Sequence, residues 1–102
     1  MRFGLTEETI GKIQSVFTRY AEIECVLIFG SRVKGNYKPA SDIDLTIKGA
    51  DIPHTTFNKI LWELDDLLLP YTFDLSIYSK ITNPEFLDHI DRIGQVFYSK
   101  EC

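Results

Sequence analysis

The sequence predicts an α/β (α+β) domain in which one mixed four-stranded sheet is backed by helices. Short apolar or alternating runs of strand length lie near residues 22–29, 42–48, 72–78 and 95–99, and a helical segment precedes each of them. The resulting order α-β-α-β-α-β-α-β is typical of a sheet covered by helices. A chain of 102 residues has the size of one domain, and we expect residues 1–102 to form it.

The first helix is expected after Thr6, which can cap it, with Glu7 and Glu8 in its first turn. Its apolar residues recur at helical spacing: Ile10, Ile13, Val16, Phe17 and Tyr20. Residues 22–29 are mostly apolar and predict a buried strand. This strand should end in a turn at residues 30–31, followed by a short helix that ends near Gly35.

A loop over residues 36–41 should lead into the second strand, 42–48, which stops at Gly49. The second long helix is expected to begin at Thr55 or Thr56 and to end before Pro70. It carries a wide apolar stripe: Phe57, Ile60, Leu61, Leu64, Leu67 and Leu68.

The third strand, 72–78, alternates apolar and polar residues, so that Asp74 lies on the face opposite its apolar neighbours. Asn83 followed by Pro84 predicts the start of the last helix, which should end near Gly94. The last strand is expected at 95–99.

Composition narrows the classes of function. A hydrophobic fraction of 44% and a charged fraction of 25% are ordinary for a globular protein, and the net charge of −4 argues against capture of long nucleic acid. No apolar run approaches the length of a membrane span. Cys25 and Cys102 match neither a disulfide framework nor a metal-ligand spacing, so a reducing cytoplasm is the expected location.

The most informative stretch runs from residue 30 to residue 45. Asp42 and Asp44 are two residues apart in an expected strand, so they project from one face, roughly 6.5–7 Å apart. At roughly 6 Å, two such charges repel by about 3 kcal/mol at an effective dielectric of about 20. Carboxylates together with substrate phosphates are the ligands that Mg²⁺ prefers, so a cation between them would remove this repulsion.

Upstream, Gly30 and Ser31 end a buried strand just before a helix, where backbone N–H groups can bind an anion. Arg32, Lys34 and Lys38 add cations beside this turn in an otherwise acidic chain, as a phosphate site requires. Together, the turn and the two carboxylates predict a metal–nucleotide site. Alone, the position of Arg32 is equally explained by a solvated helix residue.

The pattern G-S-x-x-x-G, followed five residues later by S-D-x-D-L, resembles the signature of the nucleotidyltransferase superfamily typified by DNA polymerase beta. It is most similar to the minimal nucleotidyltransferase (MNT) domains, including Arg32 after Gly-Ser and Pro39 before the aspartates. The resemblance implies the nucleotidyltransferase fold over the whole chain. It also implies that Asp74 is a third catalytic aspartate, whereas its own pattern favours a solvated strand face.

The chemistry implied by this resemblance is nucleotidyl transfer with two Mg²⁺ ions and ATP as substrate. Asp42 and Asp44 would bind both ions, and Asp74 would bind one of them and help the incoming hydroxyl to lose its proton. Gly30 and Ser31 would hold the β- and γ-phosphates. Arg32 or Lys34 would neutralise charge on the pyrophosphate.

The resemblance also suggests a partner. Larger superfamily members add a domain that holds the base and the acceptor, so here we expect another polypeptide to form the other wall of the cleft. Minimal domains of this kind commonly pair with a helical HEPN-type protein, as antitoxin and toxin, and transfer AMP to a tyrosine of that toxin. Trp62, at the edge of the apolar stripe, would be exposed enough to meet such a partner.

Two alternatives remain open. One is a catalytically idle binding module that neutralises its partner by complex formation, and the other is transfer to a small hydroxylated molecule such as an aminoglycoside. The three carboxylates favour an active enzyme, because an idle site has no physical reason to keep them together. His54 and His89 have no partners at ligand spacing and are expected to be structural or solvated.

Overall fold

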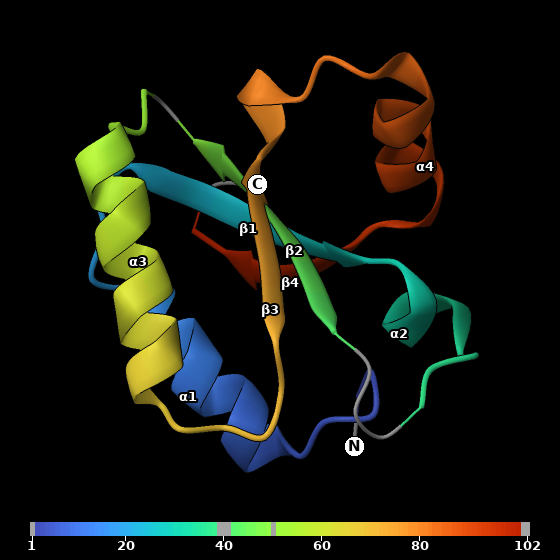
Figure 1. The fold of residues 1–102 in the computed structure, drawn as a ribbon, viewed down its shortest axis with the longest axis horizontal. Helices are drawn as coiled ribbons and strands as arrows, with labels where there is room; N and C mark the ends of the chain where they lie inside the picture. Colours follow the sequence, from blue (N-terminus) through green and yellow to red (C-terminus); the bar gives the residue numbers. More distant parts are fainter. Residues whose placement is uncertain (1, 39–41, 50, 101–102) are drawn as a thin grey trace.

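The computed structural model describes residues 2–38, 42–49 and 51–100 (Figure 1). Helices and strands alternate along the chain as the sequence predicts. They are, in order, α1 (Glu7–Phe17), β1 (Ile23–Phe29), α2 (Ser31–Lys34), β2 (Ile43–Gly49), α3 (His54–Asp66), β3 (Phe73–Ile77), the 3-10 turn η1 (Tyr78–Lys80), α4 (Pro84–Ile93) and β4 (Gln95–Ser99).

The strands form one mixed sheet in the order β3-β2-β1-β4. β1 runs antiparallel to both β2 and β4, whereas β2 and β3 are parallel. A parallel pair needs a crossover connection, and α3 supplies it. The predicted mixed four-stranded sheet backed by helices is therefore confirmed.

The core lies between the sheet and the pair α1 and α3, which pack side by side (Figure 1). Thr6 caps α1 as expected, because its hydroxyl accepts from the backbone N–H of Thr9. The helices contribute these fully buried residues: Ile10, Ile13, Val16 and Phe17 from α1, and Ile60 and Leu64 from α3. α2 and α4 lie instead near the end of β1, where Phe29 contacts Phe86 of α4 edge to face.

The end of α3 differs from the prediction. The helix begins at His54, one residue before the expected Thr55, and ends at Asp66. The expected apolar stripe was wrong at Leu68, which is 89% exposed and adopts a left-handed conformation with φ of 54°. Because the helix has already ended, helical spacing no longer decides where this side chain points.

Cys25 is buried in β1 and is disulfide-bonded, whereas the sequence predicted no disulfide framework. Cys102, together with Pro39 and Ser41 of the motif, lies outside the described residues. Of the helices in the described ranges, none combines the length and the apolar character that crossing a bilayer demands.

Candidate active site

The predicted carboxylates gather where β2 and β3 begin. The two strands are paired in parallel with Asp44 directly opposite Asp74, so these two side chains point to the same face. The register is fixed at the strand entry, where the backbone N–H of Ile43 donates to the carbonyl of Thr72 at 2.9 Å. Asp42 lies just before β2. Asp42 and Asp74 are exposed and Asp44 is half-buried.

The turn at Gly30 lies against these carboxylates. In the antiparallel pair β1–β2, Phe29 is opposite Asp44, which brings the next residue, Gly30, to the Asp44 side chain. Gly30 has φ of 79° and ψ of −154°, a conformation that is essentially restricted to glycine. A Cβ at this position would collide with Oδ2 of Asp44. The two halves of the sequence motif therefore meet through an atomic contact that only glycine permits.

The electrostatics of the site follow from this crowding. Burial raises the pKa of Asp44 to about 6, and the negative charges of Asp74 and Asp42 and a hydrogen bond with Asp74 act in the same direction. The positive charge of Arg32 opposes this shift. Protonation of one carboxyl is the response of such a cluster without a cation, and a divalent ion would hold Asp44 ionised.

The carboxylates of the site supply only part of the ligands that Mg²⁺ needs. Within the described ranges, no three acidic, histidine or cysteine side chains come close enough to enclose an ion by themselves. Mg²⁺ keeps water and substrate phosphates among its ligands, so two or three carboxylates can suffice when a nucleotide phosphate is bound beside them. The residues therefore fit a metal that arrives with a nucleotide better than a permanently bound one.

Arg32 does not face solvent. Its side chain is 3% exposed, so the alternative that it is a solvated helix residue is wrong. Nη1 donates to the carbonyl of Phe3 at 2.9 Å, and the guanidinium carbon lies 5.3 Å from the ring centre of Tyr37 and 4.9 Å from that of Tyr71. No pattern in the sequence signals these aromatic contacts, because both tyrosines lie outside helices and strands, where no periodicity reports on packing. Lys34, the last residue of α2, and Lys38 are both exposed.

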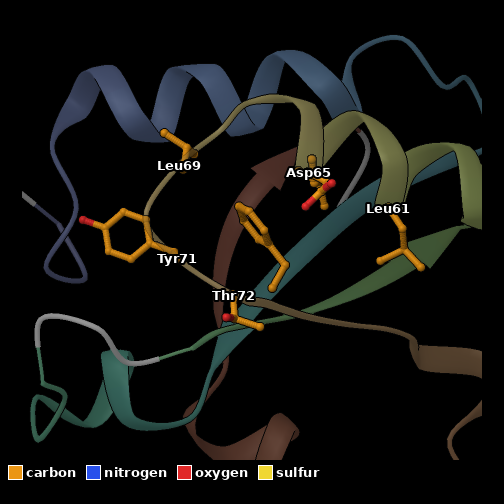
Figure 2. Close-up of a pocket in the computed structure, with 7 residues that line it drawn as sticks. Leu61, Asp65, Leu69, Tyr71 and Thr72 are labelled. Atoms are coloured by element: carbon orange, nitrogen blue, oxygen red, sulfur yellow. The ribbon is translucent and has the colours of Figure 1, made fainter.

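A cavity of about 260 Å³ lies elsewhere, between α3 and the segment that enters β3 (Figure 2). It is lined by Leu61, Leu64, Asp65, Leu69, Tyr71, Thr72 and Phe73. None of the predicted site residues lines it. Tyr71 connects the two regions, because it borders this cavity and also contacts Arg32.

The remaining residues that the sequence singled out take ordinary positions. His89 packs edge-on against Phe29, and His54 is exposed at the start of α3. Trp62 is 68% exposed on α3, as its place at the edge of the stripe suggested.

Comparison with known proteins decides the family. Residues 11–102 match the family described as Polymerase beta, Nucleotidyltransferase. The chain belongs to this nucleotidyltransferase family. The match covers Gly30, Ser31 and all three aspartates, and it confirms the resemblance that the motif carries. No curated protein is similar enough in sequence to count as a match.

Solved structures show the same fold. A toxin–antitoxin complex with AMP-PNP contains a chain that is 20% identical, with a TM-score of 0.71, over 94% of this chain and 75% of that one. A tri-AMPylated HEPN toxin from Shewanella oneidensis in complex with its MNT antitoxin gives 15% identity and a TM-score of 0.68, over 94% and 74%. The MntA–HepT toxin–antitoxin structure contains a chain that is 15% identical, with a TM-score of 0.67, over 93% of this chain and 74% of that one. The chain thus shares its fold with these toxin–antitoxin chains.

Proposed function

We propose that this nucleotidyltransferase transfers AMP from ATP to a hydroxyl group of a partner protein in a Mg²⁺-dependent reaction. The observation that carries the proposal is the contact between Gly30 and Asp44, with Asp44 paired to Asp74 on the next strand. It joins a phosphate-binding turn to a carboxylate cluster, which is the pairing of functions that nucleotidyl transfer needs.

In this proposal, the backbone of Gly30 and the hydroxyl of Ser31 bind the β- and γ-phosphates. Asp42 and Asp44 would hold both metal ions and Asp74 one of them. When bound, Mg²⁺ would stabilise the charge on the attacking and leaving oxygens. The acceptor oxygen forms a bond to the α-phosphorus, the bond to pyrophosphate breaks, and the hydroxyl proton passes to the carboxylate of Asp74.

We propose a helical HEPN-type toxin as the partner, a tyrosine as the acceptor, and an antitoxin role for this chain. Support comes from the structures that share the fold, since these include an AMPylated HEPN toxin with its MNT antitoxin. Trp62 and Leu68 expose apolar surface at the outer side and the end of α3, which a protein partner could cover. The reaction needs ATP, so we place it in the cytoplasm, where thiols are kept reduced and the disulfide at Cys25 is expected to open.

The test is incubation of the chain and its co-purified partner with ATP and Mg²⁺, followed by intact-mass spectrometry. Each transferred AMP should add about 329 Da to the partner, because pyrophosphate leaves. Asp44→Asn and Asp74→Asn should abolish the added mass. Asp88→Asn is the matched control, since it removes an exposed carboxylate of α4 whose ion pair with Arg92 contributes little.

Two other outcomes would overturn the proposal. One is a tight complex in which the partner gains no mass and is neutralised as well by Asp44→Asn as by the parent chain. This result would mean that the chain acts as a binding module. Transfer of AMP to an aminoglycoside, with none to the protein, would assign a small hydroxylated molecule as the acceptor.

A further inference from the structure

Arg32 is the only charged side chain that is buried among the residues that the structure describes. Removing a guanidinium from water is costly unless partners replace the water. Here a carbonyl and two aromatic rings do so, from segments that are far apart in the sequence: Phe3, Tyr37 and Tyr71. Arginine suits this place better than lysine, because its planar group stacks on rings while its N–H groups still donate.

The segments that Arg32 joins surround the proposed site. Arg32 directly follows Ser31 of the phosphate-binding turn. Tyr71 directly precedes Thr72, whose carbonyl accepts from Ile43 at the start of the β2–β3 pair, two residues before Asp74. On the other side, Tyr37 packs so closely on Gly4 that a Cβ there would collide with the tyrosine ring.

We propose that Arg32 is a positioning residue, which holds the Gly30–Ser31 turn at a fixed place relative to the aspartates through its contacts with Tyr71, Tyr37 and Phe3. The inference rests on the proposed function. α2 is a single turn of four residues, too short to be stable alone, so tertiary contacts must fix it.

The experiment measures binding of Mg·ATP by calorimetry at a temperature where circular dichroism shows every variant folded. Arg32→Lys keeps the charge but loses the planar stack, and Tyr71→Leu removes the ring beside it. We expect each to weaken Mg·ATP binding about tenfold, whereas Tyr71→Phe, which keeps the ring, stays within about twofold of the parent. The double variant should bind about as weakly as the worse single variant, because both changes break one unit.

Tyr78→Leu is the matched control. It removes a ring whose centre lies 4.4 Å from Nζ of Lys48. This is a cation–aromatic contact of the same kind, but it lies beyond the other end of β3. It should leave Mg·ATP binding within about twofold of the parent. If Tyr71→Leu does not fold, Tyr37→Leu replaces it, because that ring is already partly exposed and its loss should be tolerated.

Different results would refute the positioning role of Arg32 and the proposed function. Parental affinity in Arg32→Lys together with parental affinity in Tyr71→Leu would overturn the positioning role alone. Loss of affinity in a charge-removing variant, Arg32→Met, with parental affinity in both Arg32→Lys and Tyr71→Leu, would instead assign Arg32 to the phosphates and also overturn it. A parent that does not bind Mg·ATP would refute the proposed function, and the positioning role with it.

Discussion

Gly30 combines a backbone requirement with a chemical one. Its φ of 79° with ψ of −154° disfavours any other residue, and its missing Cβ leaves room for the Asp44 carboxylate. Gly35 also has a positive φ, 85°, but a Cβ there would meet nothing within 4 Å. Substitutions at Gly30 and Gly35 therefore distinguish the effect of backbone strain from the effect of displacing the Asp44 carboxylate.

We expect Gly30→Ala to weaken Mg·ATP binding about tenfold or more, because the added methyl group turns Asp44 away from the metal position. Gly35→Ala should cost about 1 kcal/mol of stability through strain alone and leave binding nearly unchanged. Calorimetry and urea unfolding of both variants check this. Equal binding losses in the two would show that strain, not contact with Asp44, is responsible.

Asp44 makes the stability depend on pH in a defined direction. Its pKa is raised in the folded chain from an ordinary 3.8 to about 6, so the folded state binds a proton more tightly than the unfolded chain does. Its favourable contribution is therefore complete below about pH 4 and is lost as the pH rises through about 6. Without metal, Asp44 is a source of instability at neutral pH.

Asp44→Asn removes this effect. In EDTA at pH 8, we expect the variant to be more stable than the parent by about 1 kcal/mol, a value reduced from the full shift because the group is partly solvated. The difference should shrink as the pH falls from about 6 to about 4. Urea unfolding at several pH values measures it, and Asp88→Asn should show no such trend. A parent that is the more stable of the two at pH 8 in EDTA would contradict the crowding of the carboxylates.

Among the secondary-structure elements, the end of α3 carries a residue that does not stabilise the isolated chain. Leu67 is the C-cap, and Leu68 follows in the left-handed conformation with its side chain 89% exposed. Glycine is the residue that normally occupies this position after a helix. A leucine here gains almost no burial and carries backbone strain, so its presence favours a role at the surface.

Leu68→Gly should therefore raise the stability of the isolated chain by about 0.5–1 kcal/mol, or leave it unchanged, although it removes a large apolar side chain. Thermal unfolding measures this. Leu67→Gly is the control and should destabilise, because Leu67 has an ordinary helical conformation and packs against the core. Destabilisation by Leu68→Gly as large as that by Leu67→Gly would show that Leu68 contributes to packing.

At the scale of the whole molecule, the sheet brings together residues that are far apart in the chain. The antiparallel β1–β2 pair carries Gly30 to Asp44, and the parallel β2–β3 pair carries Asp74 to the same place. α3, which makes the parallel crossover, is also the element that exposes Trp62. The strand entries thus hold the proposed catalytic groups, and the outer side of the crossover helix presents the surface proposed for a partner.

The order of the elements and the two halves of the motif can be read from the amino-acid sequence alone. Capping by Thr6 and Asn83, and the alternation around Asp74, depend on neighbours within one or two turns, so they are legible in a single chain. These local signals also sufficed for the resemblance to nucleotidyltransferases.

Which of these residues contact one another becomes apparent only in the folded chain. The contact of Gly30 with Asp44 and the pairing of Asp44 with Asp74 depend on strand register, which residues far apart in the chain set together. Burial of Arg32 beside Tyr71 depends on the path of two irregular segments, which carry no periodic pattern. Local patterns reflect short-range backbone preferences, whereas these contacts arise from packing of the whole chain, and that is why the sequence showed the groups but not their arrangement.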